Sequence, residues 1–363
     1  MTATLGVTPT PSQPTPERPA PSRIGSLPSH PVFWPLIALL VLVVINVIVT
    51  PGFLDIRIVN GGVFGNPVDI ARNSAPLILV AVGMTLVVAT RGIDLSVGAV
   101  AVIAAAVACT RIVASPDESA ASTVIMAVAW ALGACLLLGL WNGLLVSVFG
   151  IQPIIATLVL MVAGRGLAML VTDGQITTVA DGAFGFLASG IVLGLPVALL
   201  IALAVVALTV LITRRTALGM LVEAVGINPE ASRLAGVRSR TIVWTVYVFA
   251  ALCAGIAGLI IAANTNSVNA NSLGLWIELD AILAVVIGGT ALTGGRFSLA
   301  GTVVGALLIG TLTRTITNVG IPSEANYLFK ALVIIVVCLL QSPRARASLR
   351  TLRPTSRKAR AHE

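Results

Sequence analysis

The chain has 363 residues, of which 57% are hydrophobic and only 10% are charged, and its mean hydropathy is +1.03. Soluble globular domains carry about 25% charged residues, so this composition excludes a soluble fold and predicts a polytopic membrane protein. The net charge of +8 does not indicate nucleic acid binding, because the Lys and Arg residues gather beside apolar runs and form no basic stripe with interleaved aromatic residues.

The two ends of the chain differ in composition from its centre. Residues 1–32 are predicted to be a disordered, Pro-rich cytoplasmic tail, because eight of the nineteen prolines lie within them. This tail does not resemble a cleaved signal peptide, since no short basic region directly precedes the first apolar run. Residues 342–363 hold seven Lys and Arg residues and are predicted to be a basic cytoplasmic tail.

The centre of the chain, residues 33–341, is predicted to be a transmembrane domain with an all-α fold of about ten transmembrane helices. A helix needs about 20 mostly apolar residues to cross the hydrocarbon core, and ten segments meet or approach that length. These segments are residues 33–50, 75–90, 94–111, 122–149, 153–172, 190–213, 240–263, 279–293, 298–314 and 326–341.

The distribution of charge between these spans predicts their orientation. The loop at residues 214–239 is rich in Arg and is expected inside, as is the C-terminal tail. The loops at residues 173–189 and 264–278 contain acidic residues and no Lys or Arg, and they fit the outside. Ten spans with both termini cytoplasmic satisfy this distribution.

The segment TRGIDLSVGAV, between the second and third predicted spans, contains two charged residues. Arg91 is expected at the inner membrane surface, where a positive charge is favoured. Asp94 is expected to begin the next helix, with Asp94 and Ser96 satisfying its first backbone N–H groups. Gly92 is expected to permit the chain reversal, and Gly98 to let a neighbouring segment approach closely.

The loop at residues 214–239 is predicted to form a helix, a turn and a second short helix. The stretch ALGMLVEAVG is amphipathic, and Gly226 suits a helix stop because Gly adopts the left-handed conformation at low cost. Asn228 is the predicted N-cap of the second helix, Pro229 follows it, and Gly236 ends the helix. The loop is either a solvated connection or a docking element for a partner protein. Its docking residues would be Glu223, Ala224, Gly226, Asn228 and Gly236.

The stretch VIGGTALTGG at residues 286–295 is too rich in Gly for a rigid helix. It predicts either close helix packing or a broken helix of the kind that marks transport pathways. The spacing of Gly92 and Gly98 recurs in Gly295 and Gly301, where each pair spans a turn into a helix, but this is only a weak internal echo.

Residues for catalysis or metal binding are scarce. The only histidines, His30 and His362, lie in the terminal tails, so the sequence predicts no histidine base and no metal site in the membrane. Neither Lys330 nor Lys358 follows a Gly, so a phosphate-binding P-loop is absent. No catalytic residue and no cofactor is expected, and transport is the favoured function. The four cysteines lie in apolar runs without metal spacing and are predicted to be small buried residues: Cys109, Cys135, Cys253 and Cys338.

Several segments resemble the permease subunits of ABC sugar importers. EAVGINPEASRLAGV resembles their ATPase-coupling loop, and GIDLSVGAV resembles the most recognisable motif of permeases of the ribose, arabinose and galactofuranose type. LGLWNGLLVS, IQPIIATLVLMVAGRGLAMLVTDG and LDAILAVVIGGTALTGGRFSLAGTVVGALLIG match in the same order, and GGVFGNPVDI and LWIELDAILAVVIGG are most similar to the galactofuranose type. The resemblance covers about residues 33–341.

This resemblance carries expectations about architecture, location and partners. It implies a ten-helix importer permease in the cell inner membrane, with ATP hydrolysis on a separate cytoplasmic ATPase subunit. It also implies a periplasmic sugar-binding protein and a second permease, which is either another copy or a paralogue. The implied substrate is a galactofuranose-like or ribose-like monosaccharide.

A sugar that crosses the membrane needs polar partners for its hydroxyl groups, and polar residues within spans are the candidates. Asn142 could instead form a helix–helix hydrogen bond, and Glu278 and Asp280 could cap the next helix or meet the binding protein. Trp141 and Trp276 either stack on a sugar or mark the membrane interface. The candidate pathway residues are Asn73, Asp94, Ser96, Asn142, Gln152, Thr157, Asn264, Glu278 and Asp280.

Other functions are compatible with the same residues. A proton-coupled secondary transporter would use Asp94 or Asp280 as its proton carrier. A receptor or scaffold would only hold a cytoplasmic partner. Within ABC importers, a permease for branched-chain amino acids is a related alternative, and the motif GIDLSVG favours sugars.

Overall fold

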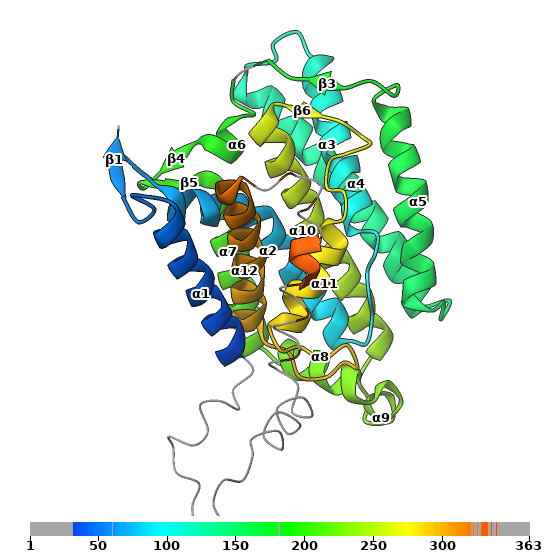
Figure 1. Cartoon of the computed structure of the whole chain (residues 1–363). Coiled ribbons are helices and arrows are strands. Elements are labelled where there is room, and N and C mark those ends of the chain that lie inside the picture. Colours follow the sequence, from blue (N-terminus) through cyan, green and yellow to red (C-terminus); the bar gives the residue numbers. More distant parts are fainter. Residues whose placement is uncertain are drawn as a thin grey trace, which may run out of the picture.

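The computed structural model describes residues 32–59, 61–180, 182–320, 322, 325, 328–332, 335 and 339. Apart from Val32, the two predicted tails lie outside the described residues, as do Cys338 and much of the predicted span 326–341. The described chain is a helical bundle (Figure 1). Its labelled helices are α1 Phe33–Val49, α2 Asn66–Ala89, α3 Val97–Val113, α4 Ala121–Ser147, α5 Pro153–Val171, α6 Phe186–Ser189, α7 Val197–Arg215, α8 Leu218–Ile227, α9 Pro229–Leu234, α10 Ser239–Thr265, α11 Ile277–Ile287 and α12 Leu299–Val319, and residues 328–332 are also helical.

Helices occupy the predicted spans that the structure describes, which confirms a helical, polytopic protein. Six described helices have the length and hydropathy for a membrane crossing: α2, α4, α5, α7, α10 and α12. The helices α1 and α3 have 17 residues each, slightly below the usual length of about 20. In the predicted span 279–293, the 11-residue α11 ends at Ile287, and Gly289 with φ of 89° follows it. The predicted count of about ten spans is therefore not confirmed.

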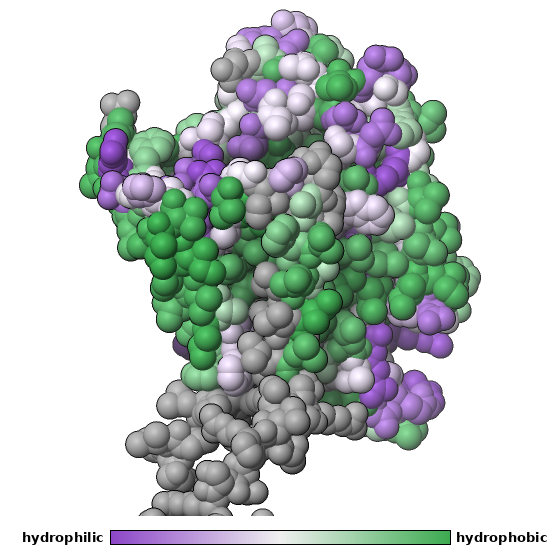
Figure 2. Space-filling view, in the orientation of Figure 1, coloured by the Kyte–Doolittle hydropathy of each residue, from purple (hydrophilic) through white to green (hydrophobic). Residues whose placement is uncertain are grey.

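The helices differ in how much of their surface the protein itself covers. The most apolar 18-residue stretch is 83% buried in α2 and 72% buried in α10, but 17% buried in α7. The centre is packed through small residues, since a Cβ atom at Gly258 of α10 would overlap the backbone of Ala101 in α3. On the face shown in Figure 2, a broad apolar band lies between a more polar upper end and a polar patch at the lower right, as a lipid-facing surface requires.

Short strand pairs and the helix pair α8–α9 mark opposite ends of the bundle (Figure 1). The strand β3 Thr177–Thr178 pairs with β6 Ser267–Val268, so the two loops predicted to be outside meet at one end. The loop at residues 214–239, predicted to be inside, forms α8 and α9 at the other end. Two further antiparallel pairs lie beside the helices: β1 Arg57–Val59 with β2 Gly62–Phe64, and β4 Ile191–Val192 with β5 Leu195–Pro196.

The segment that follows β6 does not stay at the outer end, as the predicted outside loop 264–278 would. It turns back into the bundle, where Gly274 packs against Ala101 of α3. Ala101 also packs against Gly258, which lies about 10 Å below the end of α10 at a rise of 1.5 Å per residue. The helix α11 therefore begins within the bundle, after irregular backbone at membrane depth. Such backbone occurs only where protein covers it or where it lines a water-filled cavity.

Candidate functional site

The turn between α2 and α3 contains a buried carboxylate. Asp94 is 1% exposed, and its Oδ1 accepts hydrogen bonds from the backbone N–H of Ser96 at 2.9 Å and from the Ser96 hydroxyl at 2.6 Å. The helix α3 begins only at Val97, and no side chain caps it. The predicted hydrogen bond to Asp94 from the backbone N–H two residues further on is present. The helix begins at Val97 and not at Asp94, and Ser96 does not cap it, so this bond closes the turn that precedes the helix.

The chain reversal at this turn uses a different residue from the one predicted. Arg91, and not Gly92, adopts the left-handed conformation, with φ of 65°. Gly92 is needed for space, since a Cβ atom there would lie 2.5 Å from the Tyr247 hydroxyl and 2.9 Å from the Val87 side chain. Gly98 has the predicted role, because a Cβ atom on it would overlap the Glu278 carboxylate.

Two other spans are fastened to this turn by hydrogen bonds. Asn142 of α4 donates from Nδ2 to the Ser96 hydroxyl at 2.7 Å. Thr157 of α5 accepts from the backbone N–H of Leu95 at 3.1 Å and donates to a carbonyl oxygen of its own helix. The hydrogen bond predicted as an alternative role of Asn142 is thus present. Within the described residues, Asn142 Oδ1 and the Tyr247 hydroxyl are buried without a partner, which indicates water or a ligand nearby.

The loop at residues 214–239 forms the predicted helix, turn and helix. Asn228 is the N-cap of α9, where Oδ1 accepts from the backbone N–H of Glu230 at 3.1 Å and of Ala231 at 3.0 Å. Gly236 follows α9 with φ of 85°, as a helix stop requires. The exposed Glu230 pairs with Arg233, whose guanidinium lowers the pKa of the Glu230 carboxyl.

Gly226 differs from its predicted role as a helix stop. It lies inside α8, which continues to Ile227, and it is buried. A Cβ atom at Gly226 would overlap the carbonyl oxygen of Ala89 and lie 2.6 Å from the backbone nitrogen of Gly295. Gly226 therefore faces the bundle, while Glu223 and Ala224 beside it are half-buried.

The ends of α2 and α8 meet the Gly-rich segment that precedes α12. The backbone N–H of Gly295 donates to the carbonyl oxygen of Ala89 at 2.9 Å. Arg91 donates from Nε to the carbonyl oxygen of Thr293 at 3.0 Å, and it also donates to the carbonyl oxygen of Ile227. One arginine thus links three segments that are far apart in the sequence. We call this contact region of Ala89, Arg91, Gly226, Ile227, Thr293 and Gly295 the α2–α8 junction.

The predicted glycine pairs have related positions. Gly295 lies in a turn with φ of 95°, and Gly301 lies in the first part of α12, against the carbonyl oxygen of Gly288. Gly98 likewise lies in the first turn of its helix, α3. The segment 286–295 both breaks the helix and packs closely, so the two alternatives predicted for it occur together.

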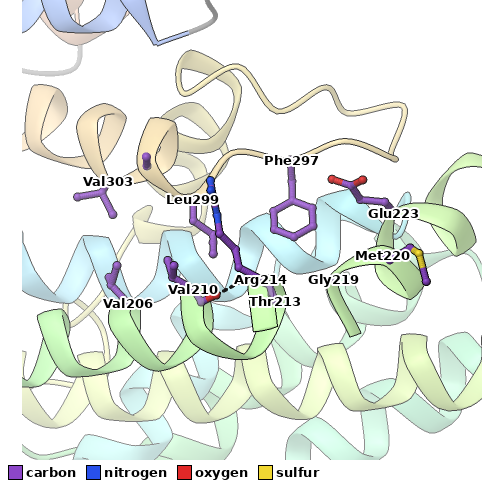
Figure 3. A pocket seen from close by; sticks show the side chains of 11 residues that line it. Val206, Val210, Thr213, Arg214, Gly219, Met220, Glu223, Phe297, Leu299 and Val303 are labelled. Carbon is purple, nitrogen blue, oxygen red and sulfur yellow. Dashed lines mark hydrogen bonds between the residues drawn. The ribbon is translucent and has the colours of Figure 1, made fainter. Parts of the chain in front are cut away.

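Two cavities lie beside these elements. The larger, of about 670 Å³, opens between α7, α8 and α12, and Figure 3 shows Arg214, Glu223 and Phe297 around it. Glu223 is the one predicted site residue that lines it. The smaller, of about 100 Å³, is lined by Asn73 and Asn264 together with apolar residues and Arg72. The structure therefore brings Asn73 and Asn264 together, away from the turn that holds Asp94.

The remaining candidates lie in separate places. Glu278 is 3% exposed in the first turn of α11, and its Oε2 has no hydrogen-bond partner among the described residues. Asp280 forms an ion pair with Lys330 at 2.8 Å. Gln152 is exposed directly before α5 and forms no capping hydrogen bond. Trp141 and Trp276 are 52% and 46% exposed.

Comparisons with known proteins decide the family. A family model described as "Branched-chain amino acid transport system / permease component" matches residues 66–338. The chain belongs to this permease family. The permease is 48% identical over 316 residues to the galactofuranose transporter permease protein YtfT of Escherichia coli, covering 86% of this chain and 91% of the relative.

Two further relatives have similar coverage. The fructose import permease protein FruF of Bifidobacterium longum is 41% identical to the permease, over 86% of this chain and 87% of the relative. The ribose import permease protein RbsC of Bacillus subtilis is 36% identical, over 84% of this chain and 91% of the relative. No solved structure matches the permease.

The sequence did not predict the contacts of three polar residues of the permease, and two of them, Tyr247 and Arg165, received no prediction at all. Arg91 was expected only to lie at the membrane surface, yet it links the α2–α8 junction. The Tyr247 hydroxyl lies against Gly92, and Arg165 of α5 reaches the backbone before α11. Arg165 could have been found, because an arginine within an apolar span is costly and indicates function.

Proposed function

We propose that the chain is the permease subunit of an ATP-driven importer and that it carries a monosaccharide such as galactofuranose, fructose or ribose. The observation that supports this is its similarity, along more than four fifths of its length, to import permeases for these three sugars. ATP would be hydrolysed on a separate cytoplasmic ATPase subunit. The sugar would be delivered by an extracytoplasmic binding protein.

The α8–α9 pair is proposed to receive the ATPase. The described residues of α9 are almost all exposed, and Asn228 holds the start of this helix in place. Gly236 is exposed directly after α9, and Glu223 and Ala224 of α8 are half-buried, whereas Gly226 is buried in the α2–α8 junction. A movement of the ATPase against α9 would therefore reach α2 and the segment before α12 through Arg91 and Gly226.

The pathway is proposed to run through ten spans, with both termini cytoplasmic, in a complex with a second permease copy or a paralogue. Asp94, Ser96, Asn142 and Thr157 would hold α3, α4 and α5 in register beside this pathway. Four further polar residues would line the ends of the pathway, or would line it only in a conformation that opens during transport: Asn73, Gln152, Asn264 and Asp280. Glu278 would act at the start of α11.

The experiment that tests this function compares two energy sources. The full chain is reconstituted in liposomes with its ATPase and binding protein, and the uptake of labelled ribose, fructose and galactofuranose is measured. Uptake should require ATP and both partner proteins, and a proton gradient alone should drive none. Uptake by the chain alone under a proton gradient would instead support a secondary transporter with Asp94 or Asp280 as the proton carrier. The ion pair of Asp280 with Lys330 argues against that role for Asp280.

A further inference from the structure

Arg165 is a charged residue within a membrane span. It lies twelve residues into the 19-residue helix α5, which is about 18 Å along a helix of about 28 Å at 1.5 Å per residue. The ion pairs of the described residues join Arg72 to Asp69, Arg233 to Glu230 and Lys330 to Asp280, so Arg165 takes part in none of them. Glu278 is close enough for its charge to interact with that of Arg165. An ionisable residue within a membrane span marks a functional site by default.

The guanidinium of Arg165 reaches the irregular backbone that enters the bundle before α11. Its Nη1 and Nη2 lie 3.4 Å from the carbonyl oxygens of Leu273 and Gly274. Both hydrogen bonds are long and therefore weak, so they engage the five N–H donors of the guanidinium only in part. Trp276, two residues beyond Gly274, has φ of 65° and is 46% exposed at the start of α11.

The start of α11 also contains an acceptor that is not satisfied. Glu278 is 3% exposed, and its Oε2 lies against Gly98 without a hydrogen-bond partner among the described residues. A buried carboxylate oxygen in this state indicates a water molecule or a ligand hydroxyl at this place. Broken helices that begin at membrane depth are where transporters bind their substrates.

We propose that Arg165 and Trp276 bind the monosaccharide during its passage and that the first turn of α11, held by Glu278 against Gly98, positions them. This inference rests on the proposed import of a sugar and deepens it. The guanidinium donates to ring and hydroxyl oxygens of the sugar, and the indole packs against its C–H face. A guanidinium would also bind the carboxylate of an amino acid, so the preference for a sugar rests on the sugar permeases to which this chain is similar.

The test uses the full chain in liposomes with its ATPase and binding protein, and labelled ribose, fructose and galactofuranose. Arg165→Gln removes the charge and keeps some hydrogen bonding, whereas Arg165→Lys keeps the charge without the planar fork. Trp276→Ala removes the aromatic face and Trp276→Phe keeps one. Arg57→Gln, in the exposed β1–β2 pair, is the matched control. Uptake and ATP hydrolysis stimulated by the sugar-loaded binding protein are both measured per molecule of permease.

Arg165→Gln should lower uptake about tenfold, the size of one lost hydrogen bond to a charged group, while stimulated ATP hydrolysis stays near that of the wild type. Uptake by Arg165→Lys should lie between that of the wild type and that of Arg165→Gln. Trp276→Phe should take up more sugar than Trp276→Ala, and Arg57→Gln should match the wild type. Wild-type uptake by Arg165→Gln, or an equal fall in uptake and ATP hydrolysis, would overturn the proposed site. Failure of the wild type to take up any of the three sugars would overturn the proposed function itself.

Discussion

The two helices of the 214–239 loop are neighbours in sequence but differ in their surroundings. The helix α8 has four buried residues among ten, and Gly226 contacts the backbone of two other segments. In the six-residue α9, Ser232 is the one buried residue, and Leu234 is 78% exposed. The first helix is therefore part of the internal packing of the permease, and the second presents an exposed surface, which we propose as the docking surface. Changes in α8 should damage transmission within the permease, and changes in α9 should damage docking.

The largest effect is expected from Gly226→Val. The added side chain would overlap the Ala89 carbonyl oxygen in the α2–α8 junction, and overpacking of this kind costs about 1–3 kcal/mol or more. Uptake should be lost and ATP hydrolysis should no longer depend on loaded binding protein, while the chain remains in the membrane. Gly150→Asn is the control, because Gly150 is exposed with φ of 70° and an added Cβ atom there would meet nothing within 4 Å. Normal uptake by Gly226→Val would show that the junction transmits nothing.

The next largest effect is expected from Arg91→Gly. Gly accepts the positive φ of this position without strain, so the substitution removes the hydrogen bonds to Thr293 and Ile227 and preserves the backbone turn. The amount of sugar moved per ATP hydrolysed should fall several-fold, with little change in thermal stability. A wild-type ratio of uptake to hydrolysis in this variant would limit the role of Arg91 to the membrane surface.

A smaller effect is expected from Asn228→Ala. The loss of this N-cap should cost about 1 kcal/mol and loosen the start of α9. The affinity of the ATPase for the permease, measured by titration in detergent, should fall several-fold, and Asn228→Ser should restore it. If the affinity is unchanged in Asn228→Ala, α9 is not the docking helix.

The smallest effect is expected from Glu230→Gln. Arg233 lowers the pKa of the Glu230 carboxyl, so the pair contributes above the ordinary pKa of a glutamate, and its contribution is lost as the pH falls through the lowered value. Both side chains are exposed, and solvent screens their attraction. Thermal unfolding at neutral pH should therefore match the wild type within error. A marked loss of ATPase binding in this variant would instead place Glu230 in the docking contact.

Local features of the sequence predicted local structure well. The N-cap at Asn228, the stop at Gly236 and the break in the segment 286–295 all follow from the conformational preferences of single residues. The apolar runs predicted the helices because a span must satisfy its backbone hydrogen bonds internally. The family was predicted because several separate stretches of the chain match its motifs in the same order.

Contacts between distant segments could not be predicted in this way. Gly226 looks like a helix stop in sequence, and its packing on Ala89 depends on where α2 ends in space. The turn at Asp94 is held by Asn142 and Thr157 from two other spans, which hydrogen-bond to its neighbours Ser96 and Leu95. Residues 269–276 can turn into the bundle because Gly98 and Gly274 have no side chains where the two segments pack together. The hydropathy of the sequence gives no information about this contact.

The most direct measurement compares a sugar with a branched-chain amino acid, since the family description names the amino acids and the relatives are permeases for sugars. Liposomes contain the full chain with its ATPase, the binding protein is added outside, and ATP is enclosed with the ATPase. Labelled ribose, fructose or galactofuranose should accumulate only with ATP, and excess leucine should not compete. Accumulation of leucine with no uptake of any of the three sugars would contradict the proposed function.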